Sequence, residues 1–164
     1  MSETIECKLE LPYKLIDIGF GDERFVLSLR SVNCGRSVCC DFEVCYRCGG
    51  IESRFACDLT PPDIYCFYIQ LDDAYDIHFG RESAAVLESS ASGRTKLRFA
   101  FDGKAQCTVS GSFASRESGY RSGVFFEDMH ADLTDIPQID AALKRFFDEM
   151  KRIKGTDTWA ETFL

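Results

Sequence analysis

Three neighbouring segments of this chain alternate apolar and polar residues so regularly that the pattern alone predicts how they pair. They span residues 24–32, 38–48 and 51–59. In the middle segment every even-numbered position is apolar, counting cysteine and tyrosine, whereas the odd-numbered positions include acids and an arginine. A period of two is typical of a β-strand that buries one face. The pattern predicts three antiparallel strands with a shared apolar face.

Two turns set the predicted register. A turn over residues 33–36 brings Val32 beside Ser37 and pairs apolar residues of the first two strands, namely Leu29 with Cys40, Leu27 with Phe42 and Phe25 with Val44. Gly49-Gly50 suits a two-residue hairpin. It pairs Cys48 with Ile51, Val44 with Phe55, Phe42 with Cys57 and Cys40 with Leu59. A slip of one residue would turn these side chains toward water, so the apolar pattern selects this register.

The rest of the chain predicts two helices and a second set of strands. Thr60 precedes two prolines, which is typical of a helix start, and an apolar stripe follows, so we predict a helix over 61–74. Strands are expected over residues 84–88, 95–101, 105–113 and 123–129, with a polar loop over 115–122. Matching the middle two strands requires a three-residue link, Asp102 to Lys104, or a bulge. A closing helix over 137–152 presents an apolar stripe of Ile139, Leu143, Phe146, Phe147 and Met150, and ends at Gly155.

These elements predict an α+β fold with antiparallel β-sheets in a sandwich-like arrangement, a crossover helix and a C-terminal amphipathic helix. The 164 residues fit one domain, which we expect over residues 1–154, followed by a tail over 155–164. Trp159 and Phe163 in that tail are expected to pack on the body or on a partner, and no internal repeat is visible in the sequence. No apolar run is long enough to cross a bilayer, and the acidic N-terminus lacks the basic and apolar regions of a signal peptide. We therefore expect a cytoplasmic protein.

The nine cysteines invite a disulfide or zinc interpretation. Their number is odd, and a cytoplasmic chain keeps its thiols reduced. Cys45 and Cys48 have the spacing of half a zinc site, but on a strand they point to opposite faces, and no second such pair exists. We predict no metal and no cofactor, with the cysteines as ordinary core and surface thiols.

The charge distribution is uneven. Residues 58–80 contain five acids and no lysine or arginine, and residues 127–140 contain five more, again without a base. These acids are Asp58, Asp63, Asp72, Asp73, Asp76, Glu127, Asp128, Asp132, Asp135 and Asp140. Their ten charges exceed the net charge of −8, so the remainder of the chain is positive by two. Acidic faces often serve only solubility, and that alternative stays open. The sharper hypothesis is one acidic surface aimed at a basic partner.

We predict that six carboxylates form this surface: Asp72, Asp73, Asp76, Glu127, Asp128 and Asp132. Phosphate-binding and nucleophile motifs are absent from the sequence, and the negative charge argues against non-specific nucleic-acid binding. His78 and His130 each stand among acids and could bind a metal or move protons, but the preferred interpretation is that they are solvated polar residues at the ends of elements. An enzyme is therefore not the expected function.

The order of elements resembles the WapI-type immunity proteins of bacterial contact-dependent toxin systems. The resemblance lies in Thr60-Pro61-Pro62-Asp63 at the crossover helix, in the strand and acidic turn from Val124 to Leu133, and in the closing helix from Ile139 to Phe147. It covers about Phe25 to Met150 and implies a cytosolic protein that binds and blocks one toxin domain, often a nuclease. No set of binding residues carries over from the family.

Three hypotheses follow from the sequence. The leading one is a non-enzymatic antitoxin that neutralises a cognate basic toxin domain through its acidic surface. The second is a ligand-binding β-module, with Tyr65, Tyr68 or Trp159 lining a small-molecule pocket. The third is a cysteine- or metal-dependent enzyme built around His78 or His130.

Overall fold

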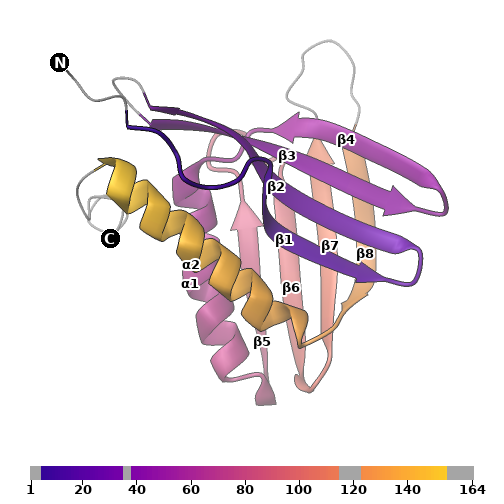
Figure 1. Ribbon diagram of the computed structural model, residues 1–164. Coiled ribbons are helices and arrows are strands. Elements are labelled where there is room, and N and C mark those ends of the chain that lie inside the picture. Colours follow the sequence, from indigo (N-terminus) through magenta and orange to yellow (C-terminus); the bar gives the residue numbers. More distant parts are fainter. Residues whose placement is uncertain (1–4, 35–37, 115–122, 155–164) are drawn as a thin grey trace.

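The computed structural model describes residues 5–34, 38–114 and 123–154, and these form two antiparallel four-stranded sheets and two helices (Figure 1). Sheet A contains, in spatial order, β1 (Tyr13–Phe20), β2 (Glu23–Cys34), β3 (Val38–Cys48) and β4 (Ile51–Cys57). Helix α1 (Pro61–Asp76) follows sheet A along the chain. Sheet B contains β5 (Phe79–Glu88), β6 (Lys96–Lys104), β7 (Cys107–Ala114) and β8 (Gly123–Ala131), and helix α2 (Asp135–Lys154) closes the fold. The predicted α+β class with a C-terminal helix is confirmed.

The element order repeats: four strands and a helix occur twice in succession. Each helix follows one sheet along the chain and packs against the first strand of the other, so that α1 lies on β5 and α2 lies on β1. The hydroxyl group of Tyr13 on β1 donates a hydrogen bond of 2.8 Å to the carbonyl oxygen of Ala142 on α2. This repeat was not predicted, because it concerns only the order of the elements and is accompanied by no visible sequence similarity.

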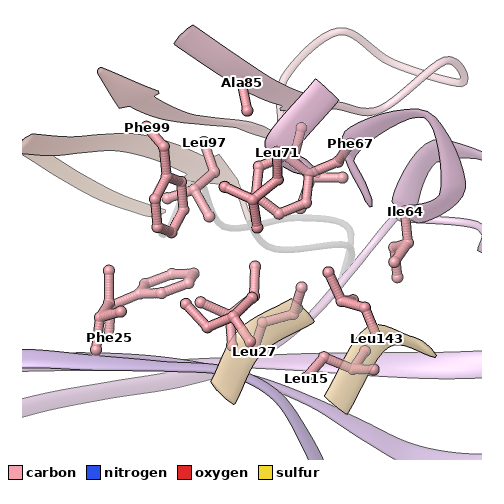
Figure 2. Packing of buried hydrophobic residues seen from close by; sticks show 14 of the residues in the cluster. Leu15, Phe25, Leu27, Ile64, Phe67, Leu71, Ala85, Leu97, Phe99 and Leu143 are labelled. Atoms are coloured by element: carbon pink, nitrogen blue, oxygen red, sulfur yellow. The ribbon is translucent and has the colours of Figure 1, made fainter. Parts of the chain in front are cut away.

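The two sheets and both helices share one apolar core. Figure 2 shows Leu15, Phe25 and Leu27 of sheet A facing Phe99 of sheet B and Leu71 of α1 across this core. All five side chains are fully buried or nearly so. Burial of each large apolar side chain contributes about 1.5–3 kcal/mol, so the core holds the helices firmly against the sheets.

The predicted hairpin of β3 and β4 is nearly right, but the predicted pairing of β2 with β3 is wrong by two residues at the three predicted pairs. Between β3 and β4, the predicted pairs Cys48–Ile51, Val44–Phe55 and Phe42–Cys57 are confirmed, whereas β4 ends before Leu59 can pair with Cys40. Between β2 and β3, the observed pairs are Leu29 with Phe42, Leu27 with Val44 and Phe25 with Tyr46.

The cause of this error is a shorter connection together with a β-bulge. Cys34 pairs with Val38, so the strands meet closer to the turn than predicted, and the register shifts again between Leu29 and Ser31. A shift of two residues keeps every side chain on its original face. The apolar pattern therefore cannot distinguish the predicted register from the observed one.

The remaining strands differ from prediction mainly at their ends. Strand β1 was not predicted, because a register shift between Lys14 and Ile16 leaves Leu15 and Ile16 buried side by side and breaks the alternation. Strand β5 begins five residues earlier than predicted, at Phe79. The predicted helices and the strands β6, β7 and β8 are confirmed within a few residues, and β6 pairs with β7 on their apolar faces. The predicted loop 115–122, Gly155 and the tail 155–164 lie outside the described residues.

Candidate functional site

The C-terminal end of α1 and the N-terminal end of α2 lie at the same end of the molecule (Figure 1). Each of these helix ends is acidic. Asp72, Asp73 and Asp76 lie in the last turns of α1, where no basic residue is present, and Asp135 begins α2. The fold thus brings together two acidic segments that are about sixty residues apart in the sequence.

A groove of about 230 Å³ runs between these helix ends. Its lining consists of Leu71, Asp72, Tyr75, Asp76, Ile136, Pro137 and Asp140. Asp72 and Asp76 stand one turn apart on the same face of α1, and Asp140 faces them from α2. No lysine or arginine is among the described residues that line the groove. We refer to this feature as the acidic groove.

The folded state disfavours the charged form of Asp140 in the acidic groove. Burial, followed by the negative charges of Asp72 and Asp76, raises the pKa of Asp140 above its ordinary value, and Lys144 offsets only part of this effect. The Oδ1 atom of Asp140 is shielded from solvent and accepts no hydrogen bond from any described residue. A buried acceptor without a donor costs about 1–3 kcal/mol, so this oxygen lowers the stability of the fold.

The acidic surface continues beyond the groove around the start of α2. The Oδ1 atom of Asp132 accepts hydrogen bonds of 2.9 Å from the backbone N–H group and 2.8 Å from the hydroxyl group of Thr134, which lower the pKa of Asp132. Burial and the charges of Asp132 and Asp17 raise the pKa of Asp135. Ile136 and Pro137, which follow Asp135 directly, line the groove.

The six carboxylates predicted to bind a partner lie in three places. Asp72 and Asp76 line the acidic groove, whereas Asp132 lies just before α2 and is not among the groove residues. Asp73 is exposed on α1 but is not among the groove residues. Glu127 and Asp128 are exposed on β8, where both oppose Ser110 at a bulge and the N–H group of Asp128 donates a 3.2 Å hydrogen bond to its hydroxyl oxygen. No described contact joins this pair to the groove.

Sequence reasoning did not select Asp140, although a signal was available. Asp140 lies four residues after Ile136 and three residues before Leu143, both of which are buried. On a helix these three residues share one face. A carboxylate on the margin of an apolar stripe therefore indicated an acid turned toward the body of the protein.

Two acids of the first acidic segment have a structural role. Asp58 accepts hydrogen bonds from the hydroxyl groups of Ser92 and Thr95, and these outweigh desolvation and lower its pKa. Asp63 is buried and accepts a hydrogen bond of 3.0 Å from the backbone N–H group of Thr60, at the start of α1. These carboxylates fix the connection between β4 and α1, which leaves the end of α1 as the exposed part of the segment.

The two histidines are held by aromatic contacts. His78 is buried, and its ring stacks on Tyr75 at 4.6 Å between centroids, while its Nδ1 atom lies within hydrogen-bonding distance of the Tyr75 carbonyl oxygen. His130 is exposed, and its ring lies 5.4 Å from that of Phe20. Within residues 5–34, 38–114 and 123–154, no group of three or more His, Cys, Asp or Glu side chains could hold a metal ion.

All nine cysteines lie within the described residues, and no disulfide joins them there. Cys45 and Cys48 both belong to β3, three residues apart, and therefore point to opposite faces of sheet A as predicted. Burial raises the pKa of Cys40 and of Cys107 to about 12, which keeps these thiols protonated.

The tyrosines proposed for a small-molecule pocket pack between the helices. Tyr65 meets the ring of Phe147 on α2 edge-on at 5.2 Å, and Tyr68 meets the same ring at 5.7 Å. These contacts help to fix α1 against α2, and with it the geometry of the acidic groove. Trp159, the third residue of that hypothesis, lies outside the described residues.

Comparison with protein-family models and with curated proteins gives no match. Within the part of the chain that the structure describes, neither helix combines the length and the apolar character needed to cross a membrane. The acidic groove is therefore interpreted from its own geometry and charge.

Proposed function

We propose that this chain is a cytoplasmic immunity protein that binds and neutralises a cognate toxin domain, through insertion of a basic side chain of the toxin into the acidic groove. The observation that carries the proposal is the convergence of Asp72, Asp76 and Asp140 on a groove without a basic lining residue. The resemblance to WapI-type immunity proteins, which rests on sequence pattern, points to the same function.

The position of the acids on α1 supports a role in binding. The C-terminal end of a helix carries partial negative charge, so each acid there costs about 0.3–1 kcal/mol. Asp72, Asp73 and Asp76 all lie near this end of α1, and its last turn has no base. Charges that oppose folding at their own position are typical of functional sites, where stability is lost in favour of activity.

The groove suits an arginine or lysine side chain in two respects. An entering cation would pair with the carboxylates that line the groove and would reduce the repulsion between Asp140, Asp72 and Asp76. The surrounding negative field would also accelerate association with a positively charged surface, by about 10- to 10³-fold. A nuclease, whose substrate is anionic, presents such a surface, and its coverage would block substrate binding.

The test uses the C-terminal domain of the protein encoded next to this chain's gene. A bacterial host that expresses this domain from an inducible promoter should stop growing, and co-expression of the wild-type chain should restore growth. The purified pair should bind with a Kd of about 1 nM or below, about −12 kcal/mol. The variant Asp72→Lys/Asp76→Lys should fail to restore growth while it remains folded by circular dichroism.

The matched control is Glu10→Lys/Asp22→Lys, which makes the same change in net charge at exposed positions outside the groove. This control should restore growth as the wild type does. Rescue by the groove variant as good as that by the control would contradict the groove as the binding site. A toxic neighbouring domain that the wild-type chain neither binds nor neutralises would contradict the proposed function itself.

A further inference from the structure

A large apolar side chain stands exposed next to the acidic groove. Phe79, the first residue of β5, is 72% exposed, and Ile77, just after the end of α1, is 45% exposed. Single exposed apolar residues are common and need no explanation. This pair is notable because it adjoins the groove and because the ring of Phe79 has a fixed support.

The support is a stack of three rings. The Phe79 ring lies 4.0 Å from the ring of buried His78, which in turn lies 4.6 Å from the ring of Tyr75. His78 also contacts Phe101 of β6, with 6.1 Å between ring centroids, and its Nδ1 atom is anchored at the Tyr75 carbonyl oxygen. Because Tyr75 lines the acidic groove, the stack runs from the wall of the groove to the exposed ring.

We infer that Phe79, together with Ile77, forms an aromatic anchor site that docks an apolar or aromatic side chain adjacent to the basic side chain of the partner. This inference rests on the proposed binding of a basic protein in the acidic groove. The occupant is specified by charge complementarity, since Tyr75, which carries the ring contacts to Phe79, lines the groove together with Asp72, Asp76 and Asp140, and these acids favour a cationic neighbour. Lys104, paired with Phe79 across β5 and β6, limits the acidic field on the other side.

The physical advantage of the stack is preorganisation. Interface hot spots are enriched in aromatic side chains, and a ring already held in place loses little conformational freedom when a partner covers it. Docking of one aromatic side chain on another contributes a gain in affinity of about three- to tenfold. The acidic groove would supply attraction and orientation, and the anchor site would add selectivity for a basic side chain with an apolar neighbour.

The experiment compares two small probes, N-acetyl-arginyl-tryptophan amide and N-acetyl-arginyl-alanine amide, by titration of the ¹⁵N-labelled chain in NMR spectra. The wild-type chain should bind the tryptophan probe about three- to tenfold more tightly, with amide shifts at Asp76 and Phe79. Phe79→Ser should make the two affinities equal. Phe125→Ser, which removes an equally exposed ring (70%) from the outer face of β8, should keep the difference.

A second variant separates the anchor site from the groove. Asp72→Asn/Asp76→Asn should weaken the binding of both probes and keep their ratio. Equal wild-type affinities, the absence of saturable binding by either probe, or a ratio that survives Phe79→Ser would overturn the inference. The growth assay is independent of these titrations: rescue by the wild-type chain with equal probe affinities rejects only the anchor site, whereas failed rescue with the expected ratio rejects only the immunity role.

Discussion

The two helices occupy equivalent places in the repeated architecture and both have an acid in the first turn, yet their C-terminal ends carry opposite charges. Helix α2 begins with Asp135 and ends with Lys151, Arg152 and Lys154, so its charges complement the helix dipole. Helix α1 has acids in its last turns and no base there. The charges of α2 are explained by stability, whereas the acids at the C-terminal end of α1 oppose it.

The carboxylates of the two helices also differ in their partners. Glu149 near the end of α2 is buried, accepts a 2.6 Å hydrogen bond from Arg152, and accepts another of 2.6 Å from the backbone N–H group of Lys8. These bonds lower the pKa of Glu149 in spite of its burial. Asp140, which faces α1 across the acidic groove, has a raised pKa. The charged form of a carboxylate is thus stabilised near the C-terminal end of α2 and disfavoured near its N-terminal end. We propose that the partner binds at the N-terminal end.

The largest expected effect is on association with the partner. Asp72→Lys/Asp76→Lys should slow association with the toxin domain by about 10- to 100-fold and flatten its dependence on salt, because two attractive charges become repulsive. Glu10→Lys/Asp22→Lys, which makes the same change in net charge outside the groove, should slow it by much less. Stopped-flow kinetics at several salt concentrations measures both. Equal slowing by the two variants would show that only total charge matters, and would contradict a specific site in the groove.

The second effect concerns stability near the C-terminal end of α2. Glu149→Gln should lower the free energy of unfolding by about 1–2 kcal/mol, because hydrogen bonds to a buried charge are lost. Since the pKa of Glu149 is lowered by folding, its contribution is present above its unfolded-state pKa and is lost as the pH falls through the folded-state pKa. Urea unfolding at neutral and acidic pH tests this. A variant whose deficit stays constant down to the lowest pH at which the chain folds would contradict the assignment.

The smallest effect has the opposite sign. Asp140→Asn should raise the free energy of unfolding at pH 7 by about 0.5 kcal/mol, because it removes a charge that the folded state disfavours. With its pKa raised by folding, Asp140 binds its proton more tightly in the folded chain, so stability falls as the pH rises from the ordinary value through the raised one. The gain should shrink as the pH is lowered through that window. Destabilisation at pH 7 would indicate a structural role for the Asp140 charge.

The sequence predicted the elements whose apolar side chains recur with a regular period. The hairpin of β3 and β4 followed from the alternation and from Gly49-Gly50, and both helices followed from their apolar stripes. Strand β1 could not be predicted, because a bulge at Leu15 breaks its apolar alternation. The pairing of β2 with β3 could not be predicted, because a bulge at Arg30 shifts the register and the apolar pattern fits both registers.

The acidic surface was predicted only in part, for a geometric reason. Charge counting found both acidic segments, and the fold brings Asp72 and Asp76 close to the segment that begins α2. It could not find Asp140 as a groove residue, because that role depends on how α2 crosses α1. The predicted strand over residues 123–129 already held Glu127 and Asp128, but charge counting could not show that no described contact joins them to the groove.

The proposed function depends on the three carboxylates that α1 and α2 bring together, without a base among the described residues that line their groove. An NMR titration of the Asp140 carboxyl carbon, in the wild-type chain and in Asp72→Asn/Asp76→Asn, tests this arrangement most directly. We expect the pKa of Asp140 to lie above the ordinary 3.8 in the wild type and to decrease clearly in the double variant. An Asp140 pKa at or below the ordinary value, unchanged by the two substitutions, would contradict the acidic groove and the function derived from it.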